Sequence, residues 1–196
     1  MDVNFIFSIA VLIFSVILHE ISHGYAAELQ GDPTARMQGR LTLNPLKHVD
    51  PIGSILVPIV SYFAGGFLIG WAKPVPFNPY NLKNQRWGEA LVAVAGPGVN
   101  ILIALVFGLF LRFYPIFTLT GEVVNLISII VIINLVPVPP LDGSKILFAL
   151  FPNSLSPLRS FLEQYSIFLV FILIFFLWKW IVPVIFILFS LITGLA

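Results

Sequence analysis

Long apolar stretches separated by shorter polar segments run through the whole chain. A helix needs about 20 apolar residues to cross a bilayer whose hydrocarbon core is about 30 Å thick. The candidate spans are Val3–Ala27, Ile52–Trp71, Ala90–Phe113, Val123–Val136 and Ile167–Leu195. The segments between them are rich in Pro, Asn, Asp and Gly and are predicted to be loops, at Gln30–Asp50, Ala72–Gly88, Tyr114–Gly121 and Pro137–Gln164. The pattern predicts an all-α polytopic membrane protein.

Two of these stretches are unlike plain membrane spans. Ile52–Trp71 is interrupted by Pro58 and by the Gly65–Gly66 pair, and Val123–Val136 is short and leads into the Pro-rich stretch 137–143. Irregular backbone at membrane depth is tolerated only where it is buried in protein or lines a water-filled cavity. Both segments are therefore candidate walls of a functional site.

The last apolar stretch is interrupted near its middle by Lys179 and Pro183. This pattern fits either one kinked helix or a span followed by an interfacial helix. No internal repeat or linker divides the chain. We therefore expect a single membrane-embedded domain over residues 1–196, with its core at 3–151 and a hydrophobic tail at 165–196.

Composition narrows the possible functions. Hydrophobic residues make up 59% of the chain and charged residues 10%, whereas soluble domains average about 45–50% and about 25%. An ordinary water-soluble enzyme is thereby excluded. Ten Lys and Arg against nine Asp and Glu leave a net charge of +1, which provides no basic surface for nucleic acid. The chain has no Cys, so thiolate catalysis, disulfides and Cys-based zinc sites are excluded too.

The first apolar stretch carries the motif His19-Glu20-Ile21-Ser22-His23. Two His four residues apart share one helical face and can bind one cation, and the Glu beside the first can reach a bound water. Zinc held in this way lowers the pKa of its water to about 7, and the Glu serves as general base. Ionisable groups within a membrane span are costly and usually functional. The motif therefore predicts a metal site with Glu20 as the catalytic group.

A third protein ligand is needed to complete a catalytic zinc site. Glu28 lies too far along the same helix to fold back, and Asp32 and Asp50 lie in a polar loop where solvated surface is the default interpretation. His48, in the same loop, could support the site or simply be a solvated or capping residue. Asp142 follows an apolar helix in an unwound stretch, with a Gly after it, and is the predicted third ligand. Cobalt or iron would also fit two His and one Asp.

The predicted metal site constrains the topology. If Asp142 meets His19 and His23, the first span and the fourth must end at the same membrane face. Ala90–Phe113 and Val123–Val136 then form an antiparallel pair, and Ile52–Trp71 must return to the side that it left. The predicted fold is a three-helix catalytic core with a re-entrant hairpin and a C-terminal hydrophobic helical tail.

The distribution of basic residues agrees with this topology. With a hairpin, eight basic residues lie on one face of the membrane against Arg112 alone on the other; the eight are Arg36, Arg40, Lys47, Lys73, Lys83, Arg86, Lys145 and Arg159. Cytoplasmic loops carry an excess of Lys and Arg. We therefore expect a multi-pass protein of the cell membrane whose active site faces the cytoplasm.

Three motifs, in order along the chain, resemble the site-2 protease family of intramembrane zinc metalloproteases. They are His-Glu-Ile-Ser-His at 19–23, Ala-Gly-Pro-Gly-Val-Asn at 95–100, and Asn-Leu-Val-Pro-Val-Pro-Pro-Leu-Asp-Gly at 134–143. The resemblance covers about residues 3–151. The chain looks like the short, minimal form of the family, because it begins directly with the zinc helix and has no room for a PDZ or CBS domain.

The resemblance implies a role for each motif residue. It implies that His19, His23 and Asp142 bind one zinc ion and that Glu20 is the catalytic Glu. Asn134 would help to bind the substrate carbonyl or oxyanion, a known form of transition-state stabilisation; it could instead cap the broken helix, and both roles can hold together. The implied partners are a transmembrane protein substrate and the lipid bilayer.

The sequence thus predicts an intramembrane zinc metalloendopeptidase, with two other functions left open. One is a membrane zinc hydrolase of a lipid or a lipidated peptide, and the other is a metal-binding transporter. A transporter would be expected to carry polar residues along several spans, whereas the deep ionisable groups here form one cluster. We further expect the hairpin to present a strand on which a substrate pairs by β-augmentation, so that Pro at Leu68 or Ile69 stops cleavage without loss of zinc.

Overall fold

The computed structural model describes residues 3–65, 70–84, 86–114, 118–151, 156–172, 176 and 178–194. The described residues are helical or irregular, and none of them lies in a β-strand. The α-helices are α1 Val3–Leu29, α2 Thr34–Met37, α3 Val57–Gly65, α4 Trp87–Phe113, α5 Thr118–Leu135, α6 Asp142–Leu150, α7 Ser156–Gln164, α8 Ser166–Ile172 and α9 Trp178–Thr193. Three shorter helical segments are η1 Pro45–Lys47, the π-helical η2 Pro51–Leu56, and η3 Pro79–Asn81. The expected all-α class is confirmed.

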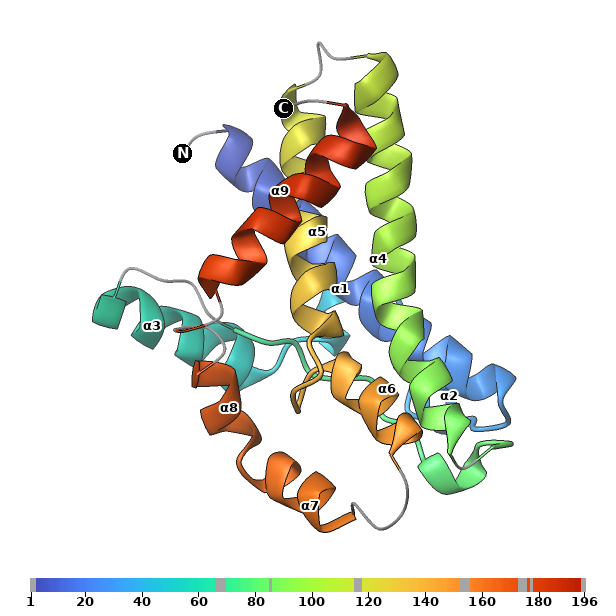
Figure 1. The fold of residues 1–196 in the computed structure, drawn as a ribbon. Coiled ribbons are helices and arrows are strands. Elements are labelled where there is room, and N and C mark those ends of the chain that lie inside the picture. Colours follow the sequence, from blue (N-terminus) through green and yellow to red (C-terminus); the bar gives the residue numbers. More distant parts are fainter. Residues whose placement is uncertain are drawn as a thin grey trace.

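Helices α1, α4 and α5 pack against one another and form the centre of the molecule (Figure 1). Ala104 of α4 is buried against Ile127 and Val131 of α5, and Val11 of α1 packs on the same cluster. Two of the helices, Ala10–Leu29 and Trp87–Phe113, are long and apolar enough to cross a membrane. The bundle matches the predicted three-helix core.

The predicted loop at Pro137–Gln164 is wrong, because α6 and α7 both lie within it. Helix α6 packs on α4, where Phe148 and Ala149 are buried. Its last carbonyls are capped by Arg86, whose Nε donates to the carbonyl oxygen of Ala149 at 2.6 Å. The loop prediction followed the Pro and Asn content of this stretch, although the apolar residues 146–151 lie within it. The predicted loop Tyr114–Gly121 likewise extends too far, since α5 begins at Thr118.

The C-terminal helix α9 lies along α5 and α4 (Figure 1). Ile185 is buried against a cluster that includes Ile129, Val136 and Leu141. A Cβ at Gly108 of α4 would lie 2.1 Å from Ile192 Cγ2, so the glycine allows close packing of the two helices. One face of α9 therefore belongs to the protein interior, which the composition of the tail did not predict.

The residues described between Pro51 and Trp71 begin and end beside each other. Asp50 Oδ1 accepts hydrogen bonds from the first amides of η2, and α3 then extends away from the bundle at the left of Figure 1. The Trp71 amide donates to the Gly53 carbonyl oxygen at 3.0 Å. Residues 51–65 are helical rather than extended. The predicted strand positions Leu68 and Ile69 lie outside the described residues.

Candidate metal centre

Three buried side chains from distant parts of the chain converge on one point. His19 Nε2 lies 3.0 Å from Asp142 Oδ2, and His23 Nε2 lies 3.2 Å from the same oxygen. The donor atoms all lie within 4.8 Å of one another, and the three residues are only 5%, 7% and 6% exposed. The structure thus brings together all three predicted metal ligands. Two imidazole nitrogens and one carboxylate oxygen, with a fourth position left for water, are a donor set that suits catalytic zinc.

Asp142 reaches the two imidazoles because helices α5 and α6 meet very closely. Asp142 is the first residue of α6, and Gly143 follows it. A Cβ at Gly143 would lie 2.2 Å from the Leu135 carbonyl oxygen at the end of α5, so only glycine fits there. The second oxygen, Asp142 Oδ1, lies 3.6 Å from Lys145 Nζ. This ion pair leaves Oδ2 as the oxygen that faces the imidazoles.

Helix α4 forms the wall behind the imidazoles. A Cβ at Gly96 would lie 2.5 Å from His23 Nε2 and 2.7 Å from His19 Cε1, so the glycine makes room for both rings. His23 Nδ1 lies 2.7 Å from the Val92 carbonyl oxygen. Because a carbonyl oxygen only accepts, Nδ1 carries a proton, which leaves Nε2 as the nitrogen that a metal would bind. A metal ligand needs this tautomer.

His19 is held from the same helix by Asn100, a residue that the sequence interpretation did not assign to the site. The Asn100 side-chain amide lies 3.3 Å from His19 Nδ1 and 3.2 Å from Ser15 Oγ, and Asn100 is fully buried. If His19 binds a metal through Nε2, its Nδ1 carries the proton, and the amide oxygen of Asn100 must face the ring. That orientation is the reverse of the one in the structure, where Ser15 Oγ donates to Asn100 Oδ1 and Nδ2 faces the ring, and it is reached by turning the amide group over. The sequence feature that could have indicated this role is a polar residue, Asn100, in an otherwise apolar helix, one α-helical turn after Gly96.

Glu20 lies on the same helix as the two His and faces a different partner. Its Oε2 accepts a hydrogen bond from the Val75 backbone amide at 2.8 Å. Val75 is buried in an irregular segment that follows Trp71. No sequence pattern indicates this contact, because it uses a backbone group of a loop 55 residues away.

The structure does not bring Asn134 to the three converging side chains through any of its described hydrogen bonds. Its Nδ2 donates to the Ile130 carbonyl oxygen of the preceding turn of α5 at 3.0 Å. This bond resembles the local role considered for Asn134, although it lies within the helix rather than at a cap. One of its two amide protons remains for another acceptor.

The other candidate ligands have structural partners outside the centre. His48 is buried, with Nε2 2.8 Å from the Thr42 carbonyl oxygen. Glu28 pairs with Arg36, and Asp50 caps η2. Asp32 is fully buried and accepts hydrogen bonds from Thr34, Asn78 and Asn81. Burial raises the pKa of Asp32, but these hydrogen bonds outweigh burial and hold the pKa below its ordinary value.

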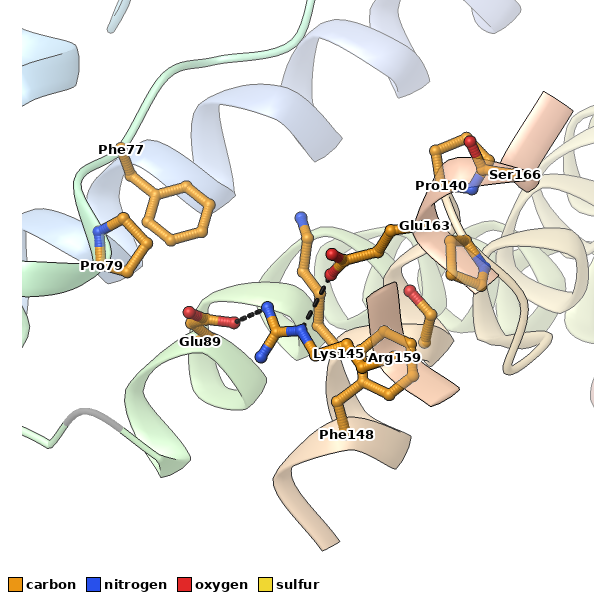
Figure 2. A pocket seen from close by; sticks show the side chains of 11 residues that line it. Phe77, Pro79, Glu89, Pro140, Lys145, Phe148, Arg159, Glu163 and Ser166 are labelled. Atoms are coloured by element: carbon orange, nitrogen blue, oxygen red, sulfur yellow. Dashed lines mark hydrogen bonds and ion pairs between the residues drawn. The ribbon is translucent and has the colours of Figure 1, made fainter. Parts of the chain in front are cut away.

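A pocket of about 370 Å³ adjoins the centre on the side of α6 and α7 (Figure 2). Lys145 connects the two, because its Nζ lies near Asp142 and 5.4 Å from the centre of the Phe77 ring. Figure 2 shows Arg159 between Glu89 and Glu163, at 3.2 Å and 2.8 Å. The lining is Phe77, Pro79, Glu89, Pro139, Pro140, Ser144, Lys145, Phe148, Arg159, Glu163 and Ser166. His19, His23 and Asp142 do not themselves line the pocket, which meets the centre only through Lys145.

Comparison with known proteins identifies relatives of the chain. Residues 7–124 match the model of peptidase family M50. The chain is 35% identical over 184 residues to "Putative zinc metalloprotease YwhC" of Bacillus subtilis, a match that covers 84% of this chain and 77% of that protein. It is 32% identical over 145 residues to "Putative zinc metalloprotease Rip2" of Mycolicibacterium smegmatis, and 30% identical to the Rip2 protein of Mycobacterium tuberculosis. These matches cover 71% of this chain, and the chain spans about half of each Rip2 protein, 55%. No solved structure matches the chain significantly.

Proposed function

This chain is a zinc metalloprotease of peptidase family M50, the site-2 protease family, and we propose that it cleaves membrane-protein substrates within or beside their transmembrane segments. The observation that carries the proposal is the position of the centre. His19, Glu20 and His23 lie within Ala10–Leu29, a helix apolar enough to cross a membrane. A site at that depth meets substrates that are themselves in the bilayer.

The outward surface of α4 supports a position within lipid. Large apolar side chains cover its exposed face along most of its length, a pattern that soluble proteins avoid outside binding sites. These side chains are Leu91, Val94, Ile101, Leu102, Leu105, Val106, Phe107, Leu109, Phe110 and Phe113. A multi-pass arrangement, in which α1, α4 and α5 each cross the bilayer, would bury this surface in lipid.

The ends of the bundle differ in charge, which supports a cytoplasmic active site. Arg36, Arg40, Lys83 and Arg86 lie on the segments that connect α1 to α4, at the end where His23 meets Val92. Arg112 lies at the other end of α4, with Nη1 3.4 Å from the Leu191 carbonyl oxygen. The Trp71 amide donates to the Gly53 carbonyl oxygen, which supports a re-entrant hairpin between these two residues. The positive-inside rule then orients the charged end toward the cytoplasm.

His19, His23 and Asp142 would hold the zinc ion. When bound, zinc activates a water at neutral pH and polarises the scissile carbonyl. The Val92 carbonyl oxygen holds the proton of His23 on Nδ1, the amide of Asn100 with its oxygen toward the ring would do the same for His19, and Lys145 pairs with the carboxylate. These contacts keep the donor atoms in place without help from the substrate.

Glu20 is the proposed proton carrier. As a carboxylate it takes a proton from the attacking water, and as the acid it then gives a proton to the leaving amine. The Val75 amide holds Oε2, so one oxygen of Glu20 is fixed while the other is available for transfer. Asn134 is the proposed donor to the developing oxyanion, through the amide proton that Ile130 does not accept.

The test compares substrates as well as variants. Purified protein in liposomes is given a transmembrane-helix substrate and a water-soluble peptide of the same cleavable sequence, for wild type and Glu20→Gln. We expect cleavage of the transmembrane substrate by wild type alone, with one zinc ion per chain in both proteins. Mass spectrometry of the products locates the cut bond.

Other outcomes would favour other functions. Cleavage of the soluble peptide alone would contradict the intramembrane substrate and leave a zinc peptidase at the membrane surface. Release of acyl chains from the lipids would favour the lipid hydrolase. Zinc flux into the liposomes, retained in Glu20→Gln, would favour the transporter, because transit does not need a general base.

A further inference from the structure

We propose that Arg40 is a positioning residue for the reaction, because it clamps the Lys73–Val75 backbone so that the Val75 amide holds Glu20. The inference rests on the proposed role of Glu20 as proton carrier. It assigns a function to a buried arginine that contacts neither the metal ligands nor Glu20 in any described hydrogen bond.

The Val75 amide is the only backbone N–H among residues 74–76. Val75 lies between Pro74 and Pro76, and proline has no N–H. This one amide donates to Glu20 Oε2 at 2.8 Å. If the Val75 backbone moved, neither neighbouring residue could replace the hydrogen bond.

The backbone before Val75 is held from two directions. The Lys73 amide donates to the His48 carbonyl oxygen at 2.8 Å. Arg40 Nη2 donates to the Lys73 carbonyl oxygen at 2.8 Å and to the Pro74 carbonyl oxygen at 3.2 Å. Hydrogen bonds from a charged donor are stronger than those between neutral groups. Arg40 thus fixes the two carbonyls that immediately precede the amide of Val75.

Arg40 is itself placed by the end of helix α2. Gly39 has a φ of +61°, the left-handed conformation that glycine adopts without strain, and it turns the chain after the helix. The Arg40 amide then donates to the Ala35 carbonyl oxygen at 2.9 Å. With its backbone fixed in this way, the Arg40 side chain points into the protein, and Arg40 is only 6% exposed.

Stability alone does not explain this arrangement. Among the described residues no carboxylate lies within ion-pair distance of the Arg40 guanidinium, and its Nε is buried without a hydrogen-bond partner. A buried cation with an unpaired donor is costly. A positioning role beside the proposed catalytic carboxylate would explain why Arg40 is buried there despite this destabilisation.

Arg40→Met is the test, with Arg36→Met as the matched control. Both remove one arginine from neighbouring positions, but Arg36 is exposed and pairs with Glu28 on the surface. Two quantities are measured on the full-length zinc-loaded protein: the hydrogen-exchange rate of the Val75 amide, and kcat and KM for the transmembrane substrate. Arg40→Lys, which keeps the charge and can donate to one carbonyl, provides the conservative comparison.

In Arg40→Met we expect the Val75 amide to exchange at least about 10-fold faster. We expect kcat to fall by about 10- to 100-fold with KM within about twofold, since small misplacements of catalytic groups have effects of this size. Zinc content is unchanged. Arg40→Lys gives intermediate values of both, and Arg36→Met gives wild-type values.

Unchanged Val75 exchange in Arg40→Met, or a raised KM with unchanged kcat, would overturn the proposal. The exchange measurement does not depend on turnover. If wild type cleaved no substrate, the proposed function would fail, while Val75 exchange in Arg40→Met would still decide whether Arg40 positions this backbone.

Discussion

The two parts of the active site are built in different ways. The proposed metal ligands lie on α1 and α6 and are enclosed by α4, so that helix packing over a buried surface fixes them. Glu20, the proposed general base, lies beside His19 but is held by an amide of an irregular segment. That segment is positioned by backbone hydrogen bonds to Arg40 and His48 rather than by a helix.

This difference separates binding from catalysis. A change among the helices should alter how tightly zinc is bound, because the donor geometry depends on their packing. A change in the segment around Val75 should leave zinc in place and alter the rate. Substitutions among the helices are expected to change zinc affinity by larger factors than substitutions in the loop segment.

Replacement of a ligand should have the largest effect. Asp142→Asn keeps the size of the side chain and removes the charge that zinc requires, so zinc affinity should fall by about 1000-fold or more. Lys145→Met removes the ion pair to the other oxygen and should retain zinc. Metal analysis after dialysis against a chelator measures both. Full zinc occupancy in Asp142→Asn would show that Asp142 is not a ligand.

A methyl group added to the face of α4 behind the imidazoles should have the second largest effect on zinc affinity. Gly96→Ala places a methyl group 2.5 Å from His23 Nε2, whereas Gly98→Ala, on the same helix, meets nothing within 4 Å. Overpacking costs about 1–3 kcal/mol, so zinc affinity in Gly96→Ala should fall by about 10- to 100-fold. Gly98→Ala should bind zinc like wild type. Equal zinc affinities in the two variants would show that zinc binding does not depend on how closely α4 packs against the imidazoles.

Substitutions of Asn100, which contacts His19 Nδ1, should have a smaller effect on zinc affinity. Asn100→Leu removes the acceptor for the His19 Nδ1 proton and should lower zinc affinity by about 10-fold. Asn100→Asp retains an acceptor and should bind within about threefold of wild type. Competition with a fluorescent zinc chelator measures the affinities. If Asn100→Asp bound zinc as weakly as Asn100→Leu, Asn100 would act as a donor and the proposed tautomer would be wrong.

A change on the loop side should leave zinc binding unaffected. Asp32 joins the segment after α1 to the amide of Asn78 and the side chain of Asn81. Asp32→Asn brings a donor against these donors and should destabilise the fold by about 1–3 kcal/mol without loss of zinc.

The effect of Asp32 should also depend on pH. Because the pKa of Asp32 is lower in the folded protein than in the unfolded chain, its stabilisation is present above the ordinary pKa and is lost as pH falls through the folded value. The difference in Tm between wild type and Asp32→Asn should therefore be constant from about pH 8 to pH 5 and shrink below about pH 4. A difference that did not change with pH would mean that the charge of Asp32 is not what matters.

The helical part of the site could be predicted from the sequence to a large extent. Zinc chemistry restricts the ligands to a few residue types, and the spacing of His19 and His23 carries the geometry of a helix. The irregular Pro-rich stretch before Asp142 indicated this residue as the third proposed ligand, because irregular backbone at membrane depth is tolerated only where it is buried or lines a cavity. The long helices α1 and α4 were predicted within a few residues for the same reason.

The loop side could not be predicted in this way. Val75 acts through its backbone amide, and any residue other than proline could supply that group. Arg40 was counted only as a basic residue of a cytoplasmic loop, because nothing local shows that it is buried. Asn100 was not assigned to the site, and α6 and α7 were taken for a loop, since their partners are distant in the sequence. Such contacts follow from the fold rather than from a local pattern.

Zinc K-edge absorption of wild type and Glu20→Gln, with kcat measured on the same samples, tests the account most directly. We predict two imidazole nitrogens and oxygen ligands at about 2.0–2.2 Å in both proteins. We also predict a fall in kcat of at least about 100-fold in Glu20→Gln. A single imidazole in wild type would contradict the proposed ligands. A changed coordination shell in Glu20→Gln would show that Glu20 binds the metal and is not held apart from it by Val75.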